Sequence, residues 1–303
     1  MPVIDQKSVF GHIISHPLFL LIVGILFIIA AAMASGLFGH AIVPYLGRSQ
    51  WFDFGMSAFT AATAIFFYWL FVRFIERKPF ADFERSGAGK EWLVGVGIGA
   101  GAMALTVGAI ALLGGYRITG MNALDAMIAM AGVSISSGVL EEILFRGIAF
   151  RFIEQWLGSW VALAATAALF GAVHLGNPGA TPIAGIAIAL EAGILLGAVY
   201  MVTRRLWAAI GLHMAWNFTQ GGIFGVAVSG YSEPGLLRNA MQGSDLLTGG
   251  AFGAEASLSA IIICTAIGLV CLWRAMRTGR LVVPSWQRFK TGQDNNTAAE
   301  VFG

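Results

Sequence analysis

The sequence predicts an all-α polytopic membrane protein, a bundle of about eight transmembrane helices. Three observations predict this class. The 303 residues are 57% hydrophobic and 11% charged, against about 25% charged residues in average soluble proteins, and the mean hydropathy is +0.78. Apolar runs of about 20 residues recur along the chain, long enough to cross a hydrocarbon core of roughly 30 Å as helices. A soluble domain is thereby excluded.

The expected spans follow one another with short connections. They are Pro17–Phe38, Phe54–Ile75, Trp92–Leu113, Leu124–Ile153, Ser159–His174, Pro182–Val202, Leu206–Val228 and Ser257–Met276. The first is longer than the roughly 7–15 apolar residues of a signal peptide, so we expect an uncleaved span. We expect residues 1–280 to form a single transmembrane domain. The polar residues 281–303 are expected to form a disordered tail.

The connections alternate in their Lys and Arg content. Counted from the N-terminal segment, the odd-numbered ones carry 15 of the 18 Lys and Arg residues and the even-numbered ones carry 3. The positive-inside rule then places both termini and the 73–90 connection in the cytoplasm, and Arg117 and the 231–255 connection outside. An odd number of spans would disrupt this alternation, so the charge count supports the eight spans expected from hydropathy. We expect a multi-pass protein of a bacterial inner membrane.

Small residues and cysteines in the spans are expected to be structural. The net charge of +2 leaves no basic surface for nucleic acid, which is excluded as a partner. GVGIGAG at 95–101 fits a loose dinucleotide fingerprint, but it lies inside an apolar helix, where small residues favour close helix packing. The same holds for Gly193 and Gly197. Cys264 and Cys271, seven residues apart on one helix, are too distant to pair.

A few charged and polar residues interrupt the spans. Span four contains EEILFRG at 141–147, span five ends at His174, span six contains Glu191, and span seven contains HMAWN at 213–217. A charge in the middle of a membrane costs at least ~2.5–3.5 kcal/mol on insertion scales. Each of these residues therefore needs a partner or a function.

The two acids of span four differ in their expected surroundings. Glu142 and Arg146 are four residues apart, so they share a helix face and can form an ion pair. Glu141 is turned about 100° away. It shares a stripe with Ser134 and Ser137 and faces into the bundle. Glu141 is therefore the acid without a partner.

Span seven presents a polar stripe to the bundle. His213, Asn217 and Gln220 recur at helical spacing along one side. Burying polar groups one by one costs more than clustering them. We expect Glu141, His174, His213 and Asn217 to converge on one site within the membrane, nearer its cytoplasmic side.

Three motifs carry a resemblance to a known family. EExxxR, FxxxH and HxxxN, in this order on three separate apolar helices, resemble the CAAX protease and bacteriocin-processing (CPBP) family, which includes the type II CAAX prenyl endopeptidases. The resemblance covers roughly residues 92–276, the expected peptidase core. It implies an intramembrane endopeptidase that acts on a peptide or a membrane protein. It also implies that Glu141 and His174 activate a water, while His213 and Asn217 hold the oxyanion and Glu142 with Arg146 supports the site.

The role of Glu191 and the need for a metal stay open. Glu191 lies outside the three motifs, and it could line the cavity, accept a bond from His174 or His213, or help to select the substrate. No cofactor is expected. Two histidines and two glutamates could bind zinc, but a three-ligand site would use Glu141 as a ligand instead of a base, and no HExxH spacing supports zinc.

Two other classes of function remain as alternatives. The buried acids and histidines could form a proton or ion relay in a transporter, although no repeated halves are visible in the sequence. The chain could also be a non-catalytic immunity or binding protein, although all four motif residues are intact. No residue distinguishes a prenylated peptide, a bacteriocin leader or another membrane protein as the substrate.

Overall fold

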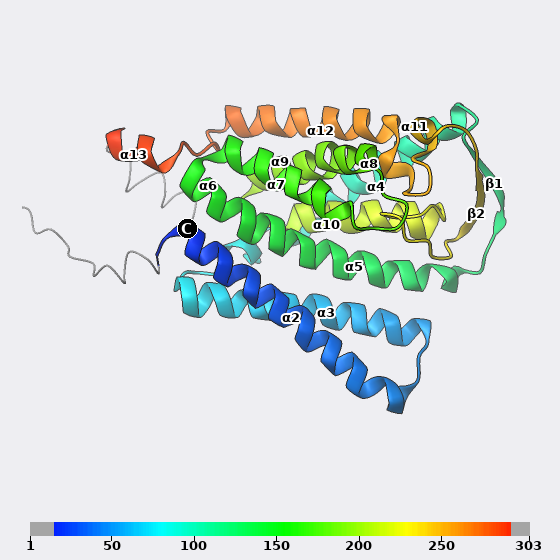
Figure 1. Cartoon of the computed structure of the whole chain (residues 1–303), viewed down its shortest axis with the longest axis horizontal. Coiled ribbons are helices and arrows are strands. Elements are labelled where there is room, and N and C mark those ends of the chain that lie inside the picture. Colours follow the sequence, from blue (N-terminus) through cyan, green and yellow to red (C-terminus); the bar gives the residue numbers. More distant parts are fainter. Residues whose placement is uncertain (1–14, 292–303) are drawn as a thin grey trace, which may run out of the picture.

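The computed structural model describes residues 15–291 and shows a polytopic helical bundle that is 75% helical (Figure 1). Six helices in this described part are long and apolar enough to cross a membrane. They are Pro17–Leu46 (α2), Gln50–Glu76, Ala88–Leu112 (α4), Leu124–Leu157, Pro182–Thr203 and Leu258–Arg277 (α12). Three of them contain more than one helical segment. Gln50–Glu76 consists of α3 (Gln50–Leu70) and a final π-helical turn, Leu124–Leu157 runs from α5 (Ile128–Glu142) to α6 (Arg151–Leu157), and Pro182–Thr203 runs from α8 (Pro182–Ile188) to α9 (Ile194–Thr203).

The other two expected spans are shorter helices. Ser159–His174 (α7) has 16 residues, and Trp207–Asn217 (α10) has 11 and continues as a π-helical turn, Phe218–Ile223 (η6). The segments that follow them fold back onto the bundle instead of leaving it at once. The backbone N–H of Gly230, for example, donates to Phe252 O over 2.8 Å. Hydropathy located these helices, but it could not show that their ends lie inside the protein.

Glycines bring α4 and α10 into close contact. A Cβ added at Gly95 would lie 2.1 Å from Ala208 O, and one at Gly99 would lie 2.2 Å from Leu212 O. No side chain fits at either position, so the packing interpretation of this glycine-rich stretch is confirmed. The contact holds α10, and with it His213, in the centre of the bundle.

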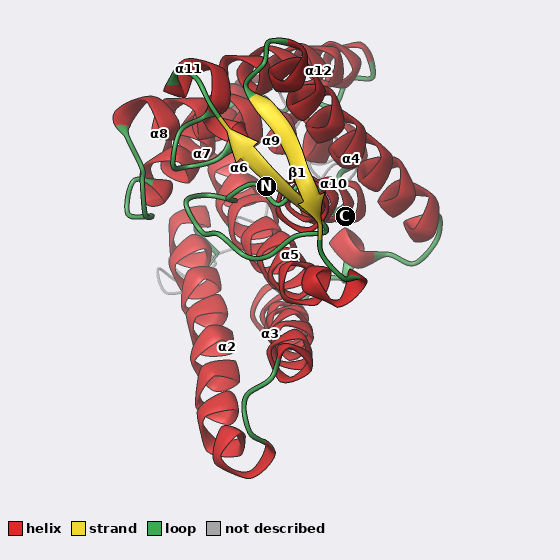
Figure 2. Ribbon diagram, turned by 90° about the vertical axis from the view of Figure 1, so that its right-hand side faces the viewer, coloured by secondary structure: helices red, strands yellow, loops and turns green. Residues whose placement is uncertain are grey.

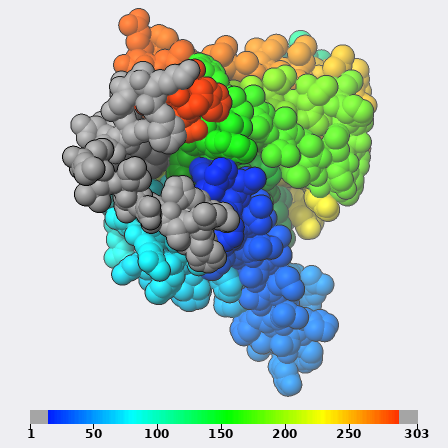
Figure 3. Space-filling model, turned by 60° about the vertical axis from the view of Figure 1, so that its left-hand side comes forward, coloured from blue at the N-terminus to red at the C-terminus, as the bar shows by residue number. Residues whose placement is uncertain are grey.

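The first two helices form a pair that extends from the body of the protein. Figure 3 shows this pair, in blue, projecting away from the rest, and Figure 2 shows α2 and α3 side by side. Only 22% of the most apolar window of α2 is buried. Ile22, Leu26 and Met33 are about half exposed. These apolar faces suit contact with lipid.

The end of the bundle that carries most Lys and Arg is tied together by ion pairs. We call it the Lys/Arg-rich end; it comprises the connections 71–90, 204–206 and 278–284 with the adjoining helix ends. Arg151 binds Glu76 through two hydrogen bonds of 2.8 and 2.6 Å, and Arg204 binds Glu154 at 2.5 Å. Because these carboxylates are buried with their partners, they fix the helix ends relative to one another.

The opposite end carries a feature that the sequence did not predict. Tyr116–Met121 (β1) and Leu237–Met241 (β2) pair as an antiparallel two-stranded sheet, with an irregularity between Ile118 and Gly120 (Figure 2). Both segments were expected to lie in connections between spans. We call this end the hairpin end. The short helix Asp245–Thr248 (α11) lies in the connection that follows β2.

The C-terminal segment differs from the expected disordered tail. Residues 281–284 are extended and Ser285–Thr291 forms a helix (α13). Ser159 explains the ordering of this segment, because its backbone N–H donates to Val282 O and its hydroxyl accepts from Val282 N. Residues 292–303 lie outside the described part, as does Lys7. Cys264 and Cys271 are both free thiols, as expected.

Candidate active site

One cavity brings together the four polar residues of the motifs. It has a volume of about 580 Å³ and lies between α5, the end of α7, and α10. Its lining includes Glu141, His174, His213 and Asn217, together with the segment 228–233. Valines 133 and 173, which are exposed on the outer surface of the bundle, form part of its wall.

The motif helices change to π-helical geometry beside this cavity. The turn Ile143–Phe150 (η4) follows the two glutamates, Ala189–Gly193 (η5) contains Glu191, and η6 follows Asn217. A π-helical turn is wider than an α-helical one and releases backbone carbonyls from their usual bonds. Here the carbonyls of Ala192 and Gly193 accept from Arg146 Nη2 over 3.0 and 3.3 Å.

The ion pair of the first motif is present and has a third member. Arg146 Nη1 lies 2.9 Å from Glu142 Oε1, and both side chains are fully buried, so this predicted pair is confirmed. His213 Nδ1 lies 2.8 Å from the same oxygen. Since a carboxylate can only accept, His213 carries its proton on Nδ1. Both contacts are made by Oε1 of Glu142, which is thereby held in place by Arg146 and His213, while its Oε2 has no hydrogen-bond partner within residues 15–291.

Glu141 is the acid that faces the cavity. Its side chain is 26% exposed, and Oε2 has no hydrogen-bond partner among the described residues. The closest charged neighbour is His213, whose Nε2 lies 4.0 Å from Glu141 Oε2. This separation is too long for a direct hydrogen bond, so the two groups interact through their charges.

Phe170, the first residue of the FxxxH motif, organises the surrounding side chains. His174 Nδ1 donates to Phe170 O over 2.7 Å, which leaves Nε2 of a neutral ring as an acceptor. The Phe170 ring lies 4.7 Å from that of His174 and 6.2 Å from that of His213, between centroids. The guanidinium of Arg146 lies 4.9 Å from the centre of the same ring. One aromatic ring therefore lies beside Arg146 and both histidines.

Asn217 completes the cavity wall. It is buried, and its Nδ2 donates to Ser137 Oγ over 3.1 Å. Ser137, one of the stripe residues expected beside Glu141, also lines the cavity. A primary amide carries two N–H groups. One is held by Ser137, and the other is available to a group inside the cavity.

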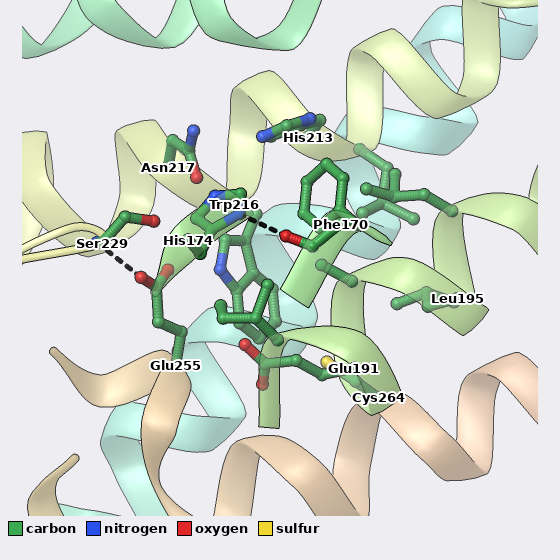
Figure 4. A pocket seen from close by; sticks show the side chains of 14 residues that line it. Phe170, His174, Glu191, Leu195, His213, Trp216, Asn217, Ser229, Glu255 and Cys264 are labelled. Carbon is green, nitrogen blue, oxygen red and sulfur yellow. Dashed lines mark hydrogen bonds between the residues drawn. The ribbon is translucent and has the colours of Figure 1, made fainter. Parts of the chain in front are cut away.

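A small inner cavity of about 30 Å³ lies behind the two histidines. Figure 4 shows Glu191 and Glu255 on its far wall, opposite His174, His213 and Asn217. Glu191 is buried, and neither of its carboxylate oxygens has a hydrogen-bond partner within residues 15–291. Of the three roles considered for Glu191, its position agrees with a lining residue, and no bond joins it to His174 or His213.

Glu255 was missed by the sequence analysis. It precedes span eight in a connection expected to face outward, yet it is 2% exposed and accepts from the backbone N–H of Ser229 over 2.5 Å. Ser229 has a positive φ of 48°, a conformation that non-glycine residues rarely adopt. Burial raises the pKa of Glu255 above its ordinary value, while the hydrogen bond from Ser229 opposes this. An isolated acid within the small apolar residues AFGAEA was the available signal.

The four residues lie at different depths along their helices. The sequence analysis expects them nearer the cytoplasmic end. His174 and Asn217 are the last residues of α7 and α10, which start at the Lys/Arg-rich end, whereas His213 is the seventh residue of α10 and lies closer to that end. The lining also includes Asn177 and the segment 228–233, which connect elements at the hairpin end.

Within 15–291, no group of three or more His, Cys, Asp and Glu side chains is arranged to hold a metal ion. Of the two glutamates considered as zinc ligands, Glu142 binds Arg146 and His213.

The fold and the cavity together define a class: a polytopic membrane protein that encloses a polar site among apolar helices, as intramembrane peptidases do. Residues 123–219 match the family described as Type II CAAX prenyl endopeptidase Rce1-like. This segment contains all three motifs, from Glu141 to Asn217, so the resemblance drawn from them is confirmed. The match supports a similarity to CPBP-family membrane peptidases over this segment. No curated protein and no solved structure matches the chain.

Proposed function

We propose that the chain is an intramembrane endopeptidase in which Glu141 and His174 activate a water for attack on a peptide bond. The observation that carries this proposal is the Glu141 carboxylate, which faces the cavity with one oxygen unpartnered and lies 4.0 Å from His213. A carboxylate in this position can act as a general base, because it can hold a water and accept its proton.

The reaction divides among the four residues as follows. The water oxygen attacks the carbonyl carbon while its proton passes to Glu141. His174 holds the same water through Nε2, since Nδ1 is bound to Phe170 O. The tetrahedral intermediate collapses when the C–N bond breaks and the leaving nitrogen takes the proton from Glu141. No covalent bond to the protein forms.

Two donors face the oxyanion. Asn217 offers its second N–H, and His213 offers Nε2–H when its ring is doubly protonated. The Glu142 carboxylate bound at Nδ1 stabilises that positive charge as it develops. A preorganised oxyanion donor contributes about 2.7–4 kcal/mol to transition-state stabilisation. Glu142 and Arg146 thus act by orienting His213, not by touching the substrate.

The membrane orientation belongs to the same proposal. Of the Lys and Arg residues described, Arg48, Arg117 and Arg238 lie at the hairpin end, and the others, apart from the interior Arg146, lie at the opposite end. The positive-inside rule therefore places the Lys/Arg-rich end in the cytoplasm. We propose that both termini are cytoplasmic as well. The protein is proposed to reside in a bacterial inner membrane.

A comparison of peptide termini tests this function. Membrane proteins from cells that produce the wild type and from cells that produce Glu141→Gln are digested, and new protein termini are identified by mass spectrometry. The proposal expects a set of termini present only with the wild type. Identical sets at equal protein levels would contradict it. Ion flux in vesicles would then test the transporter alternative.

The proposed chemistry is independent of metal ions. Cleavage by the purified protein should be unchanged by a strong chelator and by added zinc, since every proposed step uses protein side chains. Loss of activity with the chelator and recovery with zinc would contradict this part of the proposal and make Glu141 a ligand.

A further inference from the structure

We infer that a second cavity, at the Lys/Arg-rich end, binds the phosphate headgroup of an anionic phospholipid. Its lining does not include any of the four motif residues, so it is separate from the catalytic cavity and the inference does not depend on the proposed peptidase function. Three features of the structure carry it: the size and place of the cavity, the cations on its wall that have no partner, and an apolar wall that continues from them.

The cavity lies where several membrane-spanning helices end. Its wall comes from the connection after α3, the first part of α4, the end of α9 and the end of α12. Ends of membrane-spanning helices lie at the level of the lipid headgroups. The volume is about 720 Å³, and pockets that hold small molecules commonly measure ~300–1,000 Å³. The cavity therefore has room for a headgroup at the depth where headgroups are found.

The polar part of the wall has more basic than acidic side chains. The six basic side chains are those of Lys78, Arg151, Arg204, Arg205, Arg274 and Arg280, and the three acidic ones are those of Asp82, Glu84 and Glu91. Three of the arginines form ion pairs, which join Arg151 to Glu76, Arg204 to Glu154 and Arg205 to Glu91. These pairs hold the helix ends together and leave the other cations free for a ligand.

Lys78, Arg274 and Arg280 are the cations that remain. Within residues 15–291, none of their side chains has a carboxylate at ion-pairing distance. Asp82 is directed to two hydroxyl groups instead, those of Tyr68 at 2.6 Å and Tyr200 at 3.1 Å. With the two paired glutamates outside the lining included, six basic side chains meet five acids. The excess of one positive charge matches a phosphodiester, which carries one negative charge.

The charge of Lys78 lacks a counter-charge in a partly buried place. The side chain is half-buried, and the backbone N–H of Lys78 donates to Val72 O over 3.2 Å. Burial, and then the charge of Arg151, lower the pKa of Lys78 from its ordinary value. A phosphate oxygen beside this ammonium would supply the missing negative charge, and the guanidinium of Arg274 or Arg280 can bind two phosphate oxygens at once.

The deeper wall of the cavity is apolar. It includes Val94 and Ile98 on α4, Val199 on α9 and Cys271 on α12. Val94 is 51% exposed, so this wall continues into the outer surface of the bundle. Ile98 lies ten residues after the start of α4, which is about 15 Å along the helix. Inorganic phosphate would contact the basic side chains alone, whereas the glycerol backbone and upper acyl chains of a phospholipid would also cover the apolar wall. The wall therefore favours a lipid.

Lipid binding to the purified full-length protein tests the inference. The protein in a neutral detergent is titrated with phosphatidylglycerol, with phosphatidylcholine of the same acyl chains, or with inorganic phosphate. Native mass spectrometry and the melting temperature report binding. We expect phosphatidylglycerol to bind at least ~10-fold more tightly than phosphatidylcholine and to raise the melting temperature. Equal binding of the two lipids would overturn the inference. An equal rise with inorganic phosphate would overturn the lipid assignment in favour of a soluble anion.

Charge variants link the binding to this cavity. Lys78→Gln combined with Arg274→Gln removes two unpaired cations of the lining. Lys90→Gln combined with Arg277→Gln is the matched control, because both residues are exposed at the same end but do not line the cavity. At about fivefold per cation, the first pair should weaken phosphatidylglycerol binding by at least ~10-fold and the control pair by less than ~2-fold. Equal losses would assign the binding to general surface charge and overturn the inference.

A charge-conserving variant separates binding from folding. Lys78→Arg combined with Arg274→Lys keeps both positive charges and should bind phosphatidylglycerol as the wild type does. If the double Gln variant does not fold, Lys78→Gln alone should still weaken binding by about fivefold. Wild-type affinity in that single variant would overturn the inference. None of these results depends on peptide cleavage, so they leave the proposed function to its own test.

Discussion

Adjacent glutamates in one helix are expected to respond in opposite ways to the same substitution. Glu141→Gln replaces a carboxylate that has one unpartnered oxygen and no ion-pair partner within hydrogen-bond distance. Glu142→Gln replaces a carboxylate that is fully buried and binds Arg146 at 2.9 Å and His213 at 2.8 Å. Glu141→Gln should lower the cleavage rate, and Glu142→Gln should lower the free energy of unfolding as well as the cleavage rate.

The magnitudes follow from these contacts. Removing one partner of a buried ion pair costs about 3–5 kcal/mol, because the remaining charge is left uncompensated. Glu142→Gln should therefore lower the free energy of unfolding by that order. Glu141→Gln breaks no close pair, so its effect on unfolding should stay below about 1 kcal/mol. Loss of the general base should slow cleavage by about 10²-fold or more.

The assay combines denaturant unfolding in detergent with cleavage of a confirmed peptide substrate. Glu154→Gln serves as a control, since Glu154 is a buried partner of Arg204 at the other end of the bundle. It should destabilise the protein as Glu142→Gln does and leave the cleavage rate of the folded fraction unchanged. Full cleavage by Glu141→Gln, or strong destabilisation without loss of rate, would refute the assignment of Glu141 as the base.

Other variants test the remaining contacts. Asn217→Ala should slow cleavage by about 10²–10³-fold through loss of an oxyanion donor, and Ser137→Ala, which only frees the amide, should have a much smaller effect on the rate. Glu191→Gln should raise the melting temperature, because a buried carboxylate without hydrogen bonds is costly. Burial raises the pKa of Tyr116 to about 12. Above about pH 10 the unfolded chain loses this proton before the folded protein does, so the free energy of unfolding should fall between about pH 10 and 12. The fall should be smaller in Tyr116→Phe, and unfolding measured as a function of pH would show the difference.

Local patterns in the sequence were sufficient to locate the helices and the ion pair of the first motif. The pairing of Glu142 with Arg146 needs only a helix and a spacing of four residues, and both are present. The close packing of α4 at Gly95 follows from the absence of a side chain. These features depend on neighbours in the chain or on residue size alone.

Contacts between distant segments could not be read in the same way. The bond from His213 to Glu142 joins residues 71 positions apart, and Glu255 reaches the inner cavity from a connection that looked like an exposed loop. The strands β1 and β2 pair although they lie more than 100 residues apart in the chain. The lining of the cavity by Asn177 and by residues from the segment 228–233 depends on where the connections after α7 and η6 fold, which hydropathy does not encode.

The most direct test of the central claim is a structure of the protein with a phosphinate peptide, which imitates the tetrahedral intermediate of peptide hydrolysis. We predict that one phosphinate oxygen lies about 2.7–3.1 Å from Asn217 Nδ2 and faces His213 Nε2. The other oxygen should face the Glu141 carboxylate and His174 Nε2. A phosphinate bound outside this cavity, or bound inside it with Glu141 turned away from both oxygens, would contradict the account.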